Sequence, residues 1–129
     1  MFLKQDTFNY GNQSVVLTEL SGLQRVEYLA FVQQRTAEFD AMDDAMPVAE
    51  RQIEFLRMGM DINAWLVARS LWNTDQSQNV GGLYDTVRTS WSYDALGSGA
   101  EMVLSLSGMG VIKDTVDDER QDGPTPEKF

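Results

Sequence analysis

The chain has 129 residues, with ten basic and twenty acidic side chains, and its formal net charge is −10. This length suits one domain with a modest core, and the 43% of hydrophobic residues predicts that the chain folds. A chain this acidic is repelled by nucleic acid phosphates and by anionic lipids. We therefore expect it to bind neither nucleic acid nor membrane.

The residue inventory argues against catalysis. The chain has no histidine and no cysteine, which excludes histidine bases, Ser-His-Asp triads and thiolate or histidine metal sites. Glu50, Glu54 and Asp61 could do acid–base work only in a concave, partly dry site. They alternate with Arg51 and Arg57, as on a solvated helix face. We predict no enzyme activity, no metal and no cofactor.

The N-terminus carries no sign of export. Phe2 and Leu3 are followed at once by Lys4, which leaves no apolar signal-peptide region. No apolar run reaches the roughly 20 residues that span a bilayer. We expect a soluble protein that stays in the cytoplasm where it is made.

A β-hairpin is predicted first. Phe8 and Tyr10 alternate with polar residues, Gly11-Asn12 supplies a turn, and Val15 and Leu17 alternate on the returning strand.

A first helix is predicted from Glu19 to about Phe39, with Thr18 as its N-cap. Apolar residues at three- and four-residue multiples predict one broad buried face, made of Leu20, Leu23, Val26, Ala30 and Ala37. Other apolar residues of this helix point elsewhere, namely Tyr28, Leu29, Phe31 and Val32. One buried stripe does not account for all of them.

A second helix is predicted from Pro47 to about Trp72, after a connection over 40–46 in which Asp43-Asp44 is solvated. Its first apolar stripe consists of Ile53, Leu56, Met60, Ala64, Val67 and Leu71. Its second cluster, nearly opposite, consists of Phe55, Met58, Ile62, Trp65, Leu66 and Trp72. A helix that is apolar on two sides lies at the centre of its domain or is covered by a partner.

The rest of the chain is predicted as a loop, two short helices and a tail. The loop covers 73–82, and a short helix carries Leu83, Val87 and Trp91. Ser92 is expected to cap a last helix that ends near Ser107, before Gly108. Its inward residues are expected to be Leu96, Ala100, Val103 and Leu104. The tail 113–129, with six acidic and three basic residues and two prolines, is expected to be disordered.

The predicted fold is therefore mainly α: an N-terminal β-hairpin, about four helices in a small bundle over 1–112, and a disordered acidic tail over 113–129. The methionine and tryptophan residues can be interpreted either as parts of a binding surface or as parts of the core. The methionines around the second helix suit an adaptable binding surface, although core filling is their more common role. Trp65, Trp72 and Trp91 could anchor an interface, although burial of at least two in the core is expected.

Three blocks of the sequence resemble the tail assembly chaperones of long-tailed phages, the lambda minor tail protein G family. The first is the Met-Phe-Leu-Lys start with the helix motif that falls here on Leu17 through Ala30. The second is the run from Leu66 to Trp72, which ends in Ser-Leu-Trp. The third contains Thr89-Ser90-Trp91 and Leu106-Ser107-Gly108-Met109. The stretch 39–63 departs from the family pattern, so contacts there cannot be carried over.

The resemblance implies a function in tail assembly. Such chaperones coat the tape measure protein, the long helical chain that sets tail length, and keep it soluble. A programmed ribosomal frameshift makes a minor longer form that contacts the tail tube protein. The resemblance also implies that the protein works in the host cytoplasm and is absent from the mature virion.

Apolar residues beyond one buried face are the candidates for partner binding, and a homo-oligomer is also possible. The candidate residues are Leu29, Phe31, Val32, Phe55, Met58, Ile62 and Trp65. The alternative function is that of a small acidic regulatory protein that mimics DNA and inhibits a host factor. That alternative requires carboxylates along one face, whereas part of the acidity here lies in the tail.

Overall fold

The fold is a two-stranded hairpin followed by four helices, as the sequence predicted. The computed structural model describes residues 2–42 and 44–109, so the predicted tail 113–129 and the boundary at 112 lie outside the described residues. The elements are β1 (Gln5–Tyr10), β2 (Gln13–Thr18), α1 (Gly22–Asp40), α2 (Val48–Thr74), α3 (Val80–Ser90) and α4 (Tyr93–Leu106).

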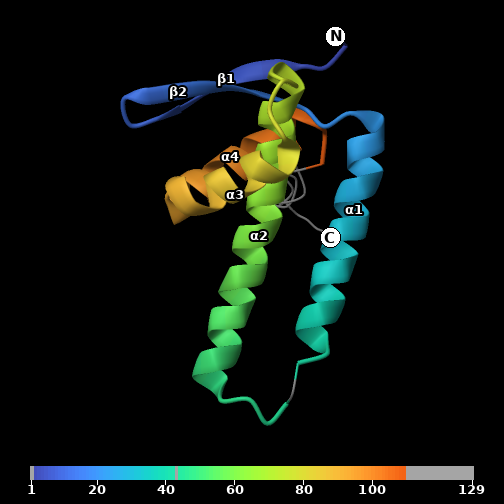
Figure 1. Cartoon of the computed structure of the whole chain (residues 1–129), viewed down its shortest axis with the longest axis vertical. Helices are drawn as coiled ribbons and strands as arrows, with labels where there is room; N and C mark the ends of the chain where they lie inside the picture. Colours follow the sequence, from blue (N-terminus) through green and yellow to red (C-terminus); the bar gives the residue numbers. More distant parts are fainter. Residues whose placement is uncertain (1, 43, 110–129) are drawn as a thin grey trace, which may run out of the picture.

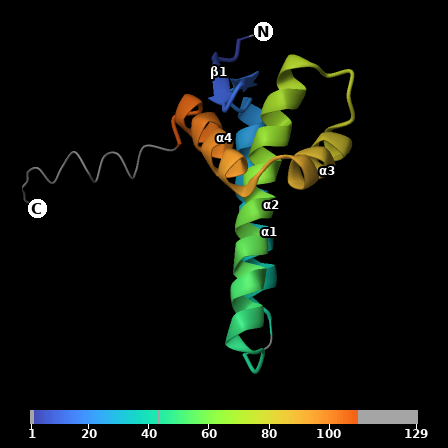
Figure 2. The same ribbon diagram turned by 90° about the vertical axis from the view of Figure 1, so that its left-hand side faces the viewer.

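The elements form a head and an arm (Figure 1). The head consists of the hairpin, α3, α4 and the C-terminal half of α2 (61–74). The arm consists of α1, the loop after it and α2 through Met60. The first half of α1 lies beside the head, and below it the two antiparallel helices extend away from the head. Figure 2 shows α3 and α4 on opposite sides of the upper part of α2, whereas the lower part of α2 has only α1 beside it. At 27 residues, α2 is about 40 Å long and belongs to both parts.

The hairpin has the predicted alternation. Phe8 pairs with Val15 across the two strands, and Gly11 turns the chain with a φ of 62°. Phe8 and Leu17 are buried against the head, and Tyr10 and Val15 are partly exposed. A two-stranded hairpin is marginal alone, so packing against α2 and α4 stabilises it.

The start of α1 differs from the prediction. Thr18 is not the N-cap, because it belongs to β2, where it pairs with Gln5. Ser21 is the N-cap: its side chain accepts a hydrogen bond from the Gln24 N–H at 3.2 Å, and the Gln24 side chain accepts one from the Ser21 N–H at 3.0 Å. This reciprocal capping box starts the helix at Gly22 rather than at Glu19.

The later boundaries agree with the sequence in part. The predicted loop 73–82 is shorter, because α2 continues to Thr74 and Asn79 caps α3, accepting a hydrogen bond from the Gly82 N–H at 2.9 Å. Ser92 caps α4 as predicted. Gly108 follows the end of α4 with a φ of 73°, the left-handed conformation expected of a helix stop.

The core lies in the head around the C-terminal half of α2. Ala64, Trp65, Leu66, Val67 and Ala68 are all buried, so the helix is covered on every side along this stretch. The hairpin and the last two helices supply the partners Phe8, Leu17, Val87, Leu96, Ala100 and Val103. In residues 2–42 and 44–109, no helix combines the length and apolar character needed to cross a membrane.

Candidate functional site

The arm is the candidate functional site, because its helices expose apolar side chains that the head does not cover. On α1, the residues that face α2 follow helical spacing and include two polar ones: Gln24, Tyr28, Phe31, Arg35 and Phe39. Phe31 stacks on Trp65 with ring centroids 5.8 Å apart, and Phe39 meets Phe55 edge-on at 5.7 Å. These contacts orient α1.

The predicted buried face of α1 is wrong in its orientation. Leu20 precedes the helix and is buried, but Leu23, Val26, Ala30 and Ala37 are exposed. Leu23 and Val26 are 68% and 65% exposed. Tyr28 and Phe31, which lie outside the predicted stripe, take the inward positions because their rings reach Trp65. The outer stripe, which we define as Leu23, Val26, Leu29, Ala30 and Ala37, therefore faces away from α2.

The first predicted stripe of α2 is half covered. Ala64 and Val67 are buried in the head, and Leu71 packs against its core. Ile53 and Leu56, on the same side of the helix further down, are 54% and 52% exposed. We call Ile53, Leu56 and the half-buried Met60 the bare stripe. It lies on the side of α2 away from α1, since Phe55 and Trp65 on the opposite side contact α1.

The seven predicted partner-binding residues do not form one surface. Leu29 is 58% exposed on the outer stripe, and Phe55 is 56% exposed near the arm tip. Trp65 is 4% exposed and belongs to the core, because it packs against Tyr28 and Phe31. The other four are half-buried, and Phe31, Met58 and Ile62 lie on the facing sides of α1 and α2, while Val32 lies next to that seam.

A hollow at the arm tip adds apolar surface that periodicity did not reveal. It has a volume of about 480 Å³ and is lined by Phe39, Asp44, Met46, Val48, Arg51, Gln52, Phe55 and Leu56. The Arg51 guanidinium lies over the Phe39 ring, 4.6 Å from its centroid. The lining residues come from both sides of the loop. The sequence predicted this loop to be a solvated connection, so it did not predict the hollow.

A buried carboxylate joins the arm to the head. Asp61 accepts a hydrogen bond from Arg35 of α1 at 2.9 Å, and Arg88 Nε of α3 lies 3.2 Å from its other oxygen. The second contact is an ion pair without a well-directed hydrogen bond. Burial lowers the pKa of Arg35, but the hydrogen bond to Glu38 and the charge of Asp61 raise it more, so its pKa lies above the usual value. Asp61 thus connects the two helices of the arm, α1 and α2, to α3 of the head.

The carboxylates considered for catalysis lie in different surroundings. Glu50 is exposed, Glu54 pairs with Arg57 at 3.4 Å, and Asp61 is engaged by two arginines. In the described part of the chain, no cluster of three or more acidic residues could hold a metal ion. What the arm offers instead is apolar area on two faces and at its tip, which is typical of a binding surface.

These features describe a small helical protein with exposed apolar surface, and comparison with known sequences gives its family. Residues 1–125 match the family described as "Bacteriophage lambda tail assembly chaperone, TAC, protein G". The chain belongs to this family of phage tail assembly chaperones, as the three sequence blocks indicated.

Individual relatives agree with this assignment. Tail assembly protein G of Escherichia phage lambda is 32% identical over 117 residues, which cover 84% of this chain and 79% of the relative. Tail assembly protein G of Escherichia phage N15 is 30% identical over 132 residues, which cover 95% of this chain and 86% of the relative. The chain also matches 39% of the longer lambda tail assembly protein GT at 32% identity. No solved structure matches the chain significantly.

Proposed function

We propose that this tail assembly chaperone binds the tape measure protein of its phage through the arm and keeps that protein soluble while the tail is assembled. The observation that carries the proposal is the pair of apolar stripes on opposite sides of the arm, one on α1 and one on α2. The head leaves both stripes exposed except at Met60, which packs against the core. Such stripes suit an elongated helical client, which lays its own apolar face against them.

The net charge of the chain supports this role. The outer stripe of α1 contains only uncharged side chains, while acidic residues elsewhere in the chain account for its net charge of −10. Like charge keeps many copies apart in solution, and the apolar stripes remain available for the client. The family assignment favours this function over mimicry of DNA.

The longer relatives support the existence of a second, longer form of this protein. The lambda and N15 relatives include both a protein G and a longer protein GT, and this chain matches the shorter part of each GT. We propose that a frameshifted longer form of this chain is also made and that its added domain contacts the tail tube protein. We place this activity in the host cytoplasm and expect no copies in the mature virion.

Several copies on one client would form an oligomer. Because the outer stripe and the bare stripe lie on opposite sides of the arm, one could contact the client while the other contacts a neighbouring copy. A contact between two different stripes is heterologous and can repeat along an extended client. Sedimentation of the chaperone with and without client tests this arrangement, and a complex with a single copy per client would contradict it.

Co-expression with the tape measure protein of the same phage tests the central proposal. Leu29→Glu and Val26→Glu place a charge on the outer stripe, and Leu56→Glu places one on the bare stripe. We expect each variant to fold and to lose most of the soluble tape measure protein that the wild-type chaperone recovers. The measurement is the fraction of client in the soluble extract and its co-purification with the chaperone.

A control variant outside the arm distinguishes the effect of an added charge from the effect of its position. Gln76→Glu adds the same charge in the exposed loop before α3 and should leave client recovery unchanged. Phe31→Glu is expected to unfold the protein instead, because Phe31 packs on Trp65 and Tyr84. If folded Leu29→Glu and Leu56→Glu proteins still recover the client fully, the arm is not the binding surface.

A further inference from the structure

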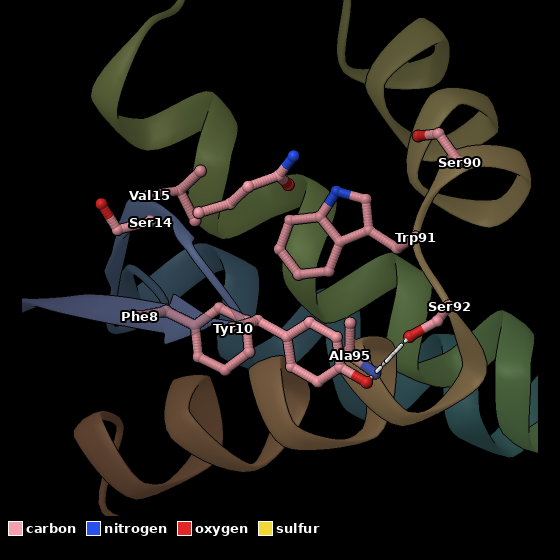
Figure 3. Close-up of a pocket in the computed structure, with 9 residues that line it drawn as sticks. Phe8, Tyr10, Ser14, Val15, Ser90, Trp91, Ser92 and Ala95 are labelled. Carbon is pink, nitrogen blue, oxygen red and sulfur yellow. Dashed lines mark hydrogen bonds between the residues drawn. The ribbon is translucent and has the colours of Figure 1, made fainter.

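A second hollow lies on the head, between the hairpin and the junction of α3 and α4 (Figure 3). It has a volume of about 300 Å³ and is lined by Phe8, Tyr10, Gln13, Ser14, Val15, Ser90, Trp91, Ser92 and Ala95. Its wall is aromatic: Phe8 stacks on Trp91 with centroids 5.8 Å apart and on Tyr10 at 6.4 Å. Tyr10 is 43% exposed, so an apolar face is left open to solvent.

Several hydrogen-bond donors of this aromatic pocket have no partner among the described residues. Ser92 donates to the Tyr10 hydroxyl oxygen at 3.3 Å, which leaves the Tyr10 O–H free to donate. Neither the Trp91 indole N–H nor the Gln13 amide N–H groups have a hydrogen-bond partner among the described residues. No charged residue lines the pocket. It therefore suits an uncharged ligand that offers carbonyl acceptors and apolar rings.

Proline has this chemistry, because its ring is apolar and its backbone has a carbonyl but no N–H. Proline-containing segments bind aromatic-lined grooves in an extended conformation that leaves their carbonyls free. The chain has three prolines, and two of them lie in Gly123-Pro124-Thr125-Pro126, outside the described residues. We propose that the aromatic pocket binds this segment of the chain's own C-terminal region. The proposal does not depend on the tape measure protein.

Charge selects this segment over its neighbours. Residues 113–122 carry five acidic and two basic side chains, and Glu127-Lys128 follows the second proline. The four residues between them are uncharged, like the pocket. Two other uncharged stretches follow the described residues: Thr115-Val116 contains no proline, and Gly110-Val111-Ile112 spans at most about 11 Å and is too short to reach the pocket.

The length of the connection fits as well. The pocket is at the start of α4, and the chain leaves the described structure just after the end of this 14-residue helix. The two ends of α4 are therefore about 21 Å apart. A random-coil chain of 14 residues, the length of 110–123, has a root-mean-square span of about 20 Å, and like charges extend such a chain further. A span that matches the separation gives the highest effective concentration of the segment at the pocket.

Paramagnetic NMR on the full chain tests this contact. The chain has no cysteine, so Phe129→Cys provides one site for a nitroxide label three residues after Pro126. We expect the label to broaden the Trp91 indole N–H and the Tyr10 and Val15 amides, and to leave the Arg57 amide in the arm sharp. In the double variant Pro124→Ala/Pro126→Ala, carrying the same label, this broadening should be lost.

The amide spectrum of each variant, compared with that of the wild type, shows whether the variant is folded. A mixture of isotope-labelled chain without nitroxide and unlabelled chain with nitroxide shows which molecule supplies the segment. Broadening confined to single chains supports the proposal. Pocket signals that stay sharp, broadening that persists in the alanine variant, or broadening that occurs mainly between chains would each overturn it.

Discussion

The Ser70 hydroxyl makes two hydrogen bonds with the backbone of Thr18: it accepts from the N–H at 2.6 Å and donates to the carbonyl at 3.0 Å. A side chain of α2 thus does for the last residue of β2 what a neighbouring strand would do. Asn73, one turn further along α2, donates to the Thr18 hydroxyl at 3.0 Å and exchanges hydrogen bonds with Gln24 of α1. This buried network holds the hairpin and α1 against the same end of α2.

Ser70→Ala should destabilise the protein by about 1–3 kcal/mol, because it leaves the buried N–H and carbonyl of Thr18 without their partner. Urea unfolding followed by far-ultraviolet circular dichroism measures this change. Ser98→Ala, on the exposed side of α4, is the matched control and should change the free energy of unfolding by less than about 0.5 kcal/mol. Equal effects of the two variants would contradict the role given to Ser70.

Two glycines of α4 should respond to alanine in opposite directions. A Cβ at Gly99 would lie 3.1 Å from Trp91 and 3.3 Å from Val67, whereas one at Gly97 meets nothing within 4 Å. Gly97→Ala should stabilise by about 0.5–1 kcal/mol through its helix propensity. Gly99→Ala should destabilise by about 1–2 kcal/mol through overpacking. Thermal unfolding of the pair measures both, and a stabilised Gly99→Ala protein would show that α4 is not packed this closely.

Asp61→Asn should destabilise the protein by about 2 kcal/mol, since it leaves the guanidinium groups of Arg35 and Arg88 without their buried counter-charge. Glu54→Gln, which alters the more exposed pair with Arg57, should cost less than about 1 kcal/mol. The effect at Asp61 should also depend less on salt, because buried pairs are screened less. Urea unfolding at low and high salt measures both, and a smaller effect at Asp61 than at Glu54 would contradict the anchoring of the arm.

Stability should fall when the pH rises above about 10, the usual pKa of tyrosine. Burial raises the pKa of Tyr28, and burial followed by the charge of Asp61 raises that of Tyr84. Between the unfolded and the folded pKa values the unfolded chain loses these protons first, so unfolding becomes more favourable as the pH rises. The double variant Tyr28→Phe/Tyr84→Phe should show a shallower decrease in urea-unfolding free energy from pH 9 upward, and an unchanged decrease would contradict the assignment.

Local signals in the sequence predicted the hairpin and the later helices well. Gly11-Asn12 between alternating strands gave the hairpin, and Ser92 and Gly108 marked both ends of the last helix. The prediction of Thr18 as the N-cap was wrong, because Ser21 and Gln24 form a capping box three residues later. In addition, Ser70 of α2 accepts a hydrogen bond from the Thr18 backbone N–H. That last contact joins residues 52 positions apart and has no signature in the local sequence.

The sequence by itself determined the family, the element order and the excess of apolar helical surface, since these depend on motifs, periodicity and composition. It did not determine which apolar face of α1 is buried. The stripe through Leu23 and Val26 has the cleaner periodicity, yet the mixed face with Gln24 and Phe31 points inward. Only the tertiary structure decided this. Trp65, Asn73 and Asp61 of α2 form a ring contact, hydrogen bonds and an ion pair with the mixed face of α1, and aliphatic side chains cannot form these interactions. The same packing leaves the aliphatic stripe exposed on the arm.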